Sequence, residues 1–109
     1  MRKFFVIGII LSWFIFSTII WAGTTGKIAG FVRDAETGEP LIGANILVSG
    51  TYLGAATDQD GYFYIINVPA GEYYLEVSMI GYRTLVHGGV QVLIDQTTKV
   101  EFELQSEAI

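Results

Sequence analysis

Two alternating apolar runs, each preceded by a turn that ends in glycine, limit this chain to an all-β fold. The first run follows Asp58-Gln59-Asp60-Gly61, and the second follows Asn67-Val68-Pro69-Ala70-Gly71. From Glu72 to Met79 the apolar side chains occupy every second position, which is the spacing of a strand with one buried face. Asp-Gly pairs favour the positive backbone angles that tight turns between strands require. The pattern predicts a small antiparallel β-sandwich, with a hairpin at Asp58–Gly61 and a further turn at Asn67–Gly71.

The same alternation, followed along the rest of the chain, predicts about seven strands and no helix after residue 22. The predicted strands are residues 27–34, 44–48, 55–57, 62–66, 72–79, two segments at 83–86 and 90–94 that Gly88 and Gly89 separate, and 99–104. Alternation places Phe63 and Phe102 in the core. We expect Leu41 and Ile42 to tuck under the sandwich, and residues 105–109 to fray as a tail.

Residues 1–22 are typical of a secretory signal peptide. Arg2 and Lys3 form a positive start, an apolar run extends from Phe4 to Trp21, and Ala22 offers a small residue for cleavage. The run is longer than the usual hydrophobic segment of a signal peptide, so an uncleaved membrane anchor stays open as the alternative. In either case the positive start stays cytoplasmic, and residues 23–109 form one exported domain. The chain would then contact a membrane only through residues 1–22, if they are retained.

Composition excludes several functions. The chain carries 11 acidic and six basic residues, for a formal net charge of −5, and two of the basic residues are Arg2 and Lys3. A domain this acidic is a poor binder of nucleic acid, because phosphate contacts need clustered Lys and Arg. It also lacks the polybasic patch that anionic lipids attract. The chain contains no cysteine, so thiol catalysis, disulfides and thiolate metal sites are excluded.

The remaining polar residues do not show catalytic or metal-binding spacing. Asp58 and Asp60 resemble the start of a calcium loop, but the twelfth position counted from Asp58 is Pro69 rather than an acidic residue. We expect Asp58 to bond the backbone N–H groups of its own turn instead. His87 is the only histidine, and the chain has no G-x-S-x-G serine motif to accompany it. We therefore predict no enzyme activity, no cofactor and no metal site.

Tyrosine is the residue type whose placement suggests binding. Five tyrosines fall in turns or on the outward faces of predicted strands, namely Tyr52, Tyr62, Tyr64, Tyr74 and Tyr82. Exposed tyrosines stack on sugar rings or pack in protein interfaces. The alternative explanation is that they form cross-strand aromatic pairs, which stabilise the sheets. These five residues are the candidate contacts to a protein partner or a glycan.

A longer pattern spans most of the predicted domain. It comprises Gly30-Phe31-Val32-Arg33-Asp34, Thr37-Gly38-Glu39-Pro40-Leu41-Ile42-Gly43-Ala44-Asn45-Ile46, Thr57-Asp58, Gly61-Tyr62-Phe63, Val68-Pro69-Ala70-Gly71 and Gly81-Tyr82. Over residues 26–104 the chain resembles the carboxypeptidase regulatory-like domain, a transthyretin-like, Ig-like Greek-key β-sandwich. It is similar to the version at the N-terminus of TonB-dependent outer-membrane receptors. The resemblance implies an accessory module, which either stands alone or forms a piece of a larger protein.

These observations lead to two expected functions. The first is a non-catalytic interaction module of the cell envelope, located in the periplasm, at the outer membrane or outside the cell. It would bind an envelope protein or the remainder of a receptor, with addition of a partner strand at a sheet edge as the expected mode of contact. The alternative is a carbohydrate-binding module that uses the outward tyrosines.

Overall fold

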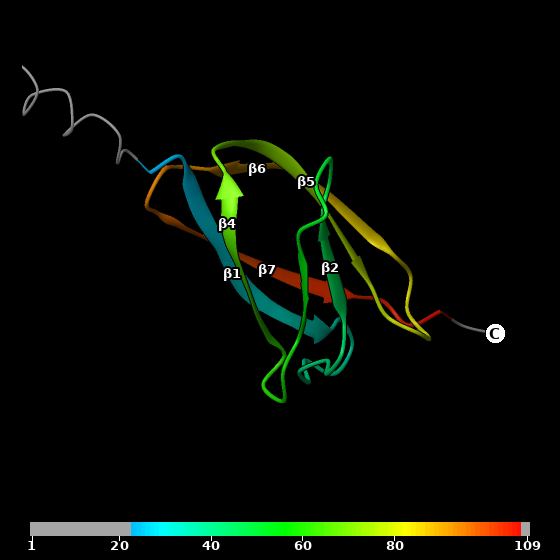
Figure 1. Ribbon diagram of the computed structural model, residues 1–109. Coiled ribbons are helices and arrows are strands. Elements are labelled where there is room, and N and C mark those ends of the chain that lie inside the picture. Colours follow the sequence, from blue (N-terminus) through cyan, green and yellow to red (C-terminus); the bar gives the residue numbers. More distant parts are fainter. Residues whose placement is uncertain (1–22, 108–109) are drawn as a thin grey trace, which may run out of the picture.

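Seven strands in two face-to-face sheets make up the part of the chain that the structure describes (Figure 1). The structure is a computed structural model that describes residues 23–107, so the expected signal peptide or anchor at residues 1–22 lies outside the described residues. The strands are β1 (Thr25–Asp34), β2 (Asn45–Val48), β3 (Gly54–Ala56), β4 (Tyr62–Pro69), β5 (Gly71–Ser78), β6 (Leu85–Val92) and β7 (Thr97–Leu104). Between residues 23 and 107, no helix has the length and apolar character needed to span a membrane. The expected seven-stranded β-sandwich is confirmed.

One sheet holds the first and the last strand side by side. Its strand order is β4-β1-β7, and the other sheet has the order β3-β2-β5-β6. β4 pairs antiparallel with β1, whereas β7 pairs parallel with β1, from Lys27 opposite Thr97 to Asp34 opposite Leu104. This parallel pair departs from the fully antiparallel arrangement that we expected. Parallel neighbours need a long crossover connection rather than a tight turn, and β1 and β7 are separated by the other five strands of the chain.

The turn at Asp58–Gly61 is present, but it does not form a hairpin. The Asp58 carboxylate accepts hydrogen bonds from the backbone N–H groups of Asp60 and Tyr62, both at 2.9 Å, as expected for this turn. Gly61 has a φ of 73°, which confirms the positive angle that the Asp-Gly pair predicts. However, β3 pairs with β2 while β4 pairs with β1, so the turn joins the two sheets. Alternation shows which face of a strand is buried and leaves its pairing partner open.

The expected turn at Asn67–Gly71 is mostly strand. β4 extends to Pro69 and β5 begins at Gly71. Asn67 adopts a φ of 57° within β4, close to where the register between β1 and β4 shifts. The residues that suggested a turn therefore form a β-bulge, which bends the strand near the point where the chain crosses to the other sheet.

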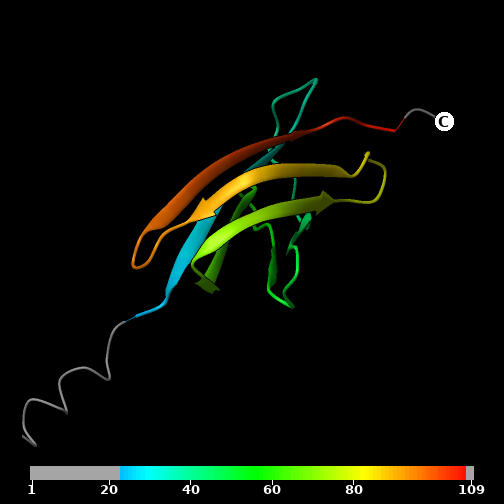
Figure 2. The same ribbon diagram turned by 90° about the horizontal axis from the view of Figure 1, so that it is seen from above.

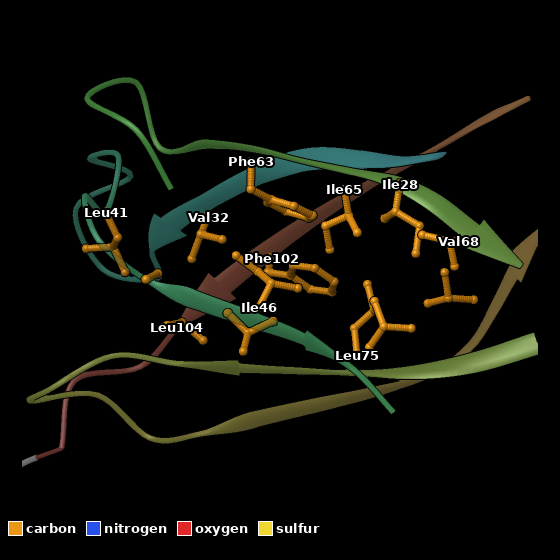
Figure 3. Close-up of a cluster of buried hydrophobic side chains, with 14 of the residues drawn as sticks. Ile28, Val32, Leu41, Ile46, Phe63, Ile65, Val68, Leu75, Phe102 and Leu104 are labelled. Carbon is orange, nitrogen blue, oxygen red and sulfur yellow. The ribbon is translucent and has the colours of Figure 1, made fainter. Parts of the chain in front are cut away.

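The core lies between the sheets, where inward side chains of both sheets meet (Figure 3). Phe63 and Phe102 are buried and stack with their ring centroids 6.1 Å apart, which confirms their predicted inward placement. Leu41 is buried as expected, but its neighbour Ile42 is 57% exposed. Only one of these two residues therefore tucks under the sandwich. The other large, fully buried side chains are Ile28, Ile46, Leu75 and Leu104.

The glycine pair near the C-terminal end does not divide β6 into two segments. β6 runs unbroken from Leu85 to Val92. A Cβ atom on Gly88 would lie 2.7 Å from the ring of Tyr74, so glycine at this position makes room for the ring. The register between β5 and β6 shifts at the same point. The two glycines thus mark a bulge within one strand.

Residues 105–107, which follow β7, are paired, contrary to the frayed tail that we expected over residues 105–109; residues 108 and 109 lie outside the described residues. The N–H group of Arg83 donates to the carbonyl of Gln105 at 2.9 Å, and the N–H group of Glu107 donates to the carbonyl of Gly81 at 2.9 Å. Tyr82 and Ser106 form an antiparallel bridge between these bonds. Residues 105–107 are therefore held by the loop that connects β5 to β6. The expectation failed because these bonds are backbone bonds, which leave no pattern in the side chains.

Candidate functional site

The five candidate tyrosines do not form one surface. Tyr62 and Tyr64 lie on the outer face of the β4-β1-β7 sheet, Tyr74 lies on the outer face of the other sheet, and Tyr52 and Tyr82 lie in loops. Tyr52 is fully exposed, Tyr74 is mostly exposed, Tyr64 is 46% exposed, and Tyr62 and Tyr82 are half-buried. A ligand that stacks on a tyrosine of one sheet cannot reach the tyrosine on the far side of the sandwich. The structure brings only Tyr62 and Tyr64 together.

Phe31, which is not one of the candidate residues predicted from the sequence, lies beside Tyr62 and Tyr64 on this face. It lies opposite Tyr62 in the register, and the two ring centroids are 5.2 Å apart. In the next row, Tyr64, Ala29 and Lys99 lie side by side across the three strands. Alternation places Phe31 on the outer face, but only the register shows that it faces Tyr62. These rows border a shallow groove whose lining residues are Ala29, Gly30, Phe31, Tyr62, Thr97, Lys99, Val100 and Glu101.

Basic side chains lie over two of these rings. The Lys27 Nζ atom is 6.0 Å from the ring centroid of Tyr64, and the Arg33 guanidinium is 5.2 Å from that of Phe31. Cations at such distances are attracted to the electron-rich face of an aromatic ring. The aromatic side chains on this face therefore interact with their own sheet. This supports the explanation that Tyr62 and Tyr64 stabilise the sheet through cross-strand pairs.

Tyr82 holds a loop to the end of β1. Its hydroxyl group donates to Asp34 Oδ2 at 2.7 Å, while Asp34 Oδ1 accepts the N–H groups of Glu36 and Thr37 at 2.8 and 3.1 Å. The bond from Tyr82, followed by the two backbone bonds, lowers the pKa of Asp34 below its ordinary value. The same bond raises the pKa of Tyr82, because the neutral phenol is the form that donates. The hydroxyl of Tyr82 thus has a structural partner already.

Tyr74 lies on an acidic and partly apolar face. Its strand also directs Glu72 and Glu76 outward, and Glu76 is opposite Leu47 of β2 and Val86 of β6. Leu47 and Val86 are both more than half exposed. The described basic residues of the strands all belong to the β4-β1-β7 sheet. The two outer faces therefore differ in charge.

The free edge of β7 is the longest regular sheet edge of the described chain. The N–H group of Lys27 donates to the carbonyl of Gln96, and that of Ala35 donates to the carbonyl of Leu104, both at 2.9 Å. In a parallel ladder, alternate residues bond the neighbouring strand, so positions 98, 100, 102 and 104 direct their backbone groups toward β1. Positions 97, 99, 101 and 103 direct theirs away from β1. Within residues 23–107, no strand pairs with this side of β7.

The other sheet edges are short or partly occupied. β3 has three residues, and Tyr62 at the start of β4 has its N–H and carbonyl groups bonded by Asp58. β6 is bulged, and the Thr98 hydroxyl group donates to the carbonyl of Gln91 at 2.7 Å. Short length, bulges and side-chain coverage are ways in which proteins block unwanted pairing at sheet edges. β7 relies instead on the charged side chains of Lys99, Glu101 and Glu103.

The acidic residues and His87 do not form a metal centre in the described part of the chain. Among residues 23–107, no group of three or more His, Cys, Asp or Glu side chains is arranged to hold a metal ion. The carboxylate of Asp58 bonds its own turn. The ring of His87 packs edge-on against Phe102, with the centroids 5.4 Å apart.

The comparisons with known proteins agree with this arrangement of strands and turns. A family model described as the CarboxypepD_reg-like domain matches residues 28–109. The chain belongs to this family. This match confirms the resemblance that the glycine, proline and aromatic positions of the sequence indicated.

Relatives of this domain are found within much longer proteins. The chain is 46% identical to the TonB-dependent receptor SusC of Bacteroides thetaiotaomicron over 56 residues, which is 51% of this chain and 5% of the receptor. It is 37% identical to the TonB-dependent receptor P39 of Formosa agariphila over 86 residues, 78% of this chain and 8% of that receptor. It is also 38% identical to human carboxypeptidase D over 78 residues, 72% of this chain and 6% of that protein. The chain therefore spans less than a tenth of the length of these relatives.

The fold of the domain also occurs among solved structures. A chain in a type II cohesin–X-dockerin complex of Acetivibrio cellulolyticus is similar, with a TM-score of 0.62 and 25% sequence identity. The match covers 71% of the present chain and 52% of that one. The likeness supports the β-sandwich assignment.

Proposed function

We propose that this CarboxypepD_reg-like domain is a non-catalytic accessory module that binds a protein of the cell envelope. The observation that carries the proposal is the family match together with the two receptor relatives, in which the matching region is a small part of a much longer protein. TonB-dependent receptors are outer-membrane proteins, which supports an envelope location. Fold alone does not determine function, so the binding surface depends on particular residues of this chain.

The proposed binding surface is the free edge of β7. Backbone N–H and carbonyl groups that lack a partner strand bind an extended peptide by adding it to the sheet. The sheet already accepts a short segment in this way, because residues 81–83 pair with residues 105–107 just beyond the end of β7. A partner strand along positions 97–103 would continue this pairing.

The charges along β7 specify the chemistry of that partner. Lys99, Glu101 and Glu103 point outward at alternate positions and are all exposed. Side chains that face each other directly across two strands attract when their charges are opposite and repel when they are alike. We therefore expect an extended segment with an acidic residue opposite Lys99 and basic residues opposite Glu101 and Glu103.

Site-specific crosslinking of the full chain in cells tests this proposal. A photo-crosslinking amino acid at position 99 or 101 should capture one discrete envelope protein, and the same amino acid at Leu47 on the opposite face should not. Glu101→Pro removes an N–H group on the free edge and should weaken binding by about 1 kcal/mol, roughly fivefold in affinity. Capture from position 47 alone, or equal capture from both faces, would contradict the β7 edge as the binding surface.

Export is part of the same proposal and needs a separate measurement. Residues 1–22 have the charge and apolar pattern of a signal peptide or an anchor. Fractionation of cells that produce the full chain should place the protein in the envelope. N-terminal sequencing of that protein then distinguishes cleavage before Gly23 from a retained Met1, and recovery from the cytoplasm would contradict export.

Carbohydrate binding is the second candidate function, and the observation that favours it is that Phe31, Tyr62 and Tyr64 occupy neighbouring rows of one outer face. A binding screen on a glycan array tests this candidate, with Tyr64→Ala and Tyr74→Ala as variants on the two faces. Loss of a glycan signal in Tyr64→Ala but not in Tyr74→Ala would support a sugar site on the β4-β1-β7 face. An array without signal, together with specific crosslinking from β7, would support the protein-binding module.

A further inference from the structure

The two ends of the described chain leave the sandwich at opposite ends (Figures 1 and 2). At one end, the carbonyl of Thr24 accepts the N–H group of Ala70. At the other end, Glu107 is bonded to Gly81. The strands that follow the first end and precede the second, β1 and β7, are direct neighbours and run in the same direction. A line drawn between the two ends therefore runs along the β1–β7 pair.

This arrangement determines how the molecule responds to tension between its ends. Pulling on residues 24 and 107 moves β1 and β7 along each other in opposite directions. The pair extends over eight residue positions on each strand, from Lys27 and Thr97 to Asp34 and Leu104. Because all interstrand bonds lie across the direction of pulling, they share the force and must break together. If β1 and β7 were instead pulled apart from the same end of the pair, the interstrand bonds would break one after another.

Close backbone contact and additional bonds reinforce this pair. A Cβ atom on Gly30 would clash with the carbonyl oxygen of Val100, so glycine permits a close approach of the two strands at their centre. The N–H group of Ala35 extends the ladder by bonding the carbonyl of Leu104. Beyond β7, the bonds between residues 105–107 and 81–83 also carry part of the load that is applied at residue 107.

We propose that the β1–β7 pair is a mechanical clamp that keeps the sandwich folded while tension passes between its two ends. A module with this property keeps the β7 edge, and a partner bound to it, in place while the two ends of the domain are pulled. The proposal rests on the proposed function for the source of the tension: an anchor retained at residues 1–22 would hold the β1 end, while a partner bound along β7 pulls on β7. The resistance itself follows from the strand order alone.

Single-molecule pulling on the full chain tests the clamp in two geometries. The chain contains no cysteine, so two introduced cysteines are unique attachment points. The pair Thr24→Cys and Glu107→Cys pulls β1 and β7 along each other. The pair Glu36→Cys and Glu107→Cys pulls the two strand ends apart at one end of the ladder. All three positions carry exposed side chains.

We expect the first geometry to require several times the force of the second at the same pulling speed. Forced unfolding is governed by the unfolding barrier, so the two geometries report on the barrier along two directions in one fold. Equal unfolding forces in the two geometries would overturn the proposal. The pulling experiment needs no partner, so equal forces would leave the proposed binding function standing. Likewise, a failure to crosslink a partner would leave the clamp standing.

A pair of adjacent proline variants tests the position of the clamp. Val100→Pro removes an N–H group that faces β1, while Glu101→Pro removes one that faces the free edge. In the first pulling geometry, Val100→Pro should lower the unfolding force strongly, and Glu101→Pro should lower it much less. A reversed order would overturn the assignment of the clamp to the β1–β7 ladder. If Val100→Pro does not fold, the two geometries applied to the otherwise unchanged chain decide the question.

Discussion

At the scale of single residues, Gly61 combines two constraints on one position. Its φ is 73°, and a Cβ atom would lie 2.7 Å from the carbonyl oxygen of Val32 and 2.9 Å from the Cβ atom of Pro40. Gly38 has the same φ of 73°, but nothing lies within 4 Å of its hypothetical Cβ atom. A side chain at position 38 would therefore suffer only the backbone strain of a positive φ, whereas a side chain at position 61 would also clash with neighbouring atoms.

We expect Gly61→Val to lower the free energy of unfolding more than Gly38→Val does. Backbone strain alone costs about 1–3 kcal/mol at a positive φ, and only Gly61→Val adds the clash. Chemical denaturation of both variants measures the difference. Equal losses would show that the turn relaxes enough to avoid the clash, and an unchanged Gly61→Val variant would contradict the positive φ.

Tyr82→Phe tests the bond to Asp34 through its dependence on pH. The folded chain lowers the pKa of Asp34, chiefly through the bond from Tyr82. The stability that Asp34 contributes is therefore present above its unfolded pKa, about 4, and is lost as the pH falls below that value. We expect Tyr82→Phe to melt at a lower temperature than the native chain at pH 7, and the difference to shrink toward pH 2.

The alkaline side and a control complete this prediction. The pKa of Tyr82 is raised in the fold, so its contribution is present at neutral pH and is lost as the pH rises beyond its unfolded pKa, about 10. Tyr52→Phe, at a fully exposed side chain, should melt like the native chain at every pH. A melting difference for Tyr82→Phe that is the same at pH 2 and pH 7 would argue against the coupling.

At the scale of elements, β4 shows what alternation does and does not predict. The inward placement of Phe63 and the outward placement of Tyr64 follow from a period of two, and both are confirmed. The partner of β4 does not follow, because many strand orders bury the same side chains. Because alternation does not identify the pairing partner, the sequence wrongly predicts a hairpin at Asp58–Gly61. For the same reason it does not show that Phe31 faces Tyr62.

Other parts of the fold depend on backbone bonds that no side-chain pattern records. The pairing of residues 105–107 with the loop before β6 is one case, and the parallel β1–β7 pair is another. Among the candidate residues, the exposure of Tyr52, Tyr64 and Tyr74 agrees with their predicted positions. The bond between Tyr82 and Asp34 joins residues 48 positions apart, and only the folded structure brings them together.

Phe63→Ala tests the packing between the two sheets. Phe63 is 1% exposed and stacks on Phe102, so its removal opens a cavity between the sheets. Such a change costs about 3–5 kcal/mol, which should appear as a large drop in the melting temperature. Tyr64→Ala, at the neighbouring outward position, should have a much smaller effect. Similar melting of the two variants would contradict the assigned faces of β4.

At the scale of the whole molecule, the last strand completes both the first sheet and the core. β7 supplies one of the two neighbours of β1, and it contributes Phe102 and Leu104 to the interior. A chain that ends after residue 96 should therefore lose its cooperative thermal transition, as followed by circular dichroism. Lys99→Ala, an exposed substitution in the same strand, should retain it. A truncated chain that still melts cooperatively would show that the remaining six strands form a stable unit.

The position of β1 between β4 and β7 also determines when β1 can complete its pairing while the chain is being synthesised. A ribosome or a translocation channel releases residues 25–34 first and residues 97–104 last, so β1 waits for its second neighbour until nearly the whole domain has emerged. Contacts between residues this far apart in sequence form slowly. During that interval Ile28 and Val32 have no completed core to enter, so a newly made chain would depend on chaperones to keep its first strand from aggregating.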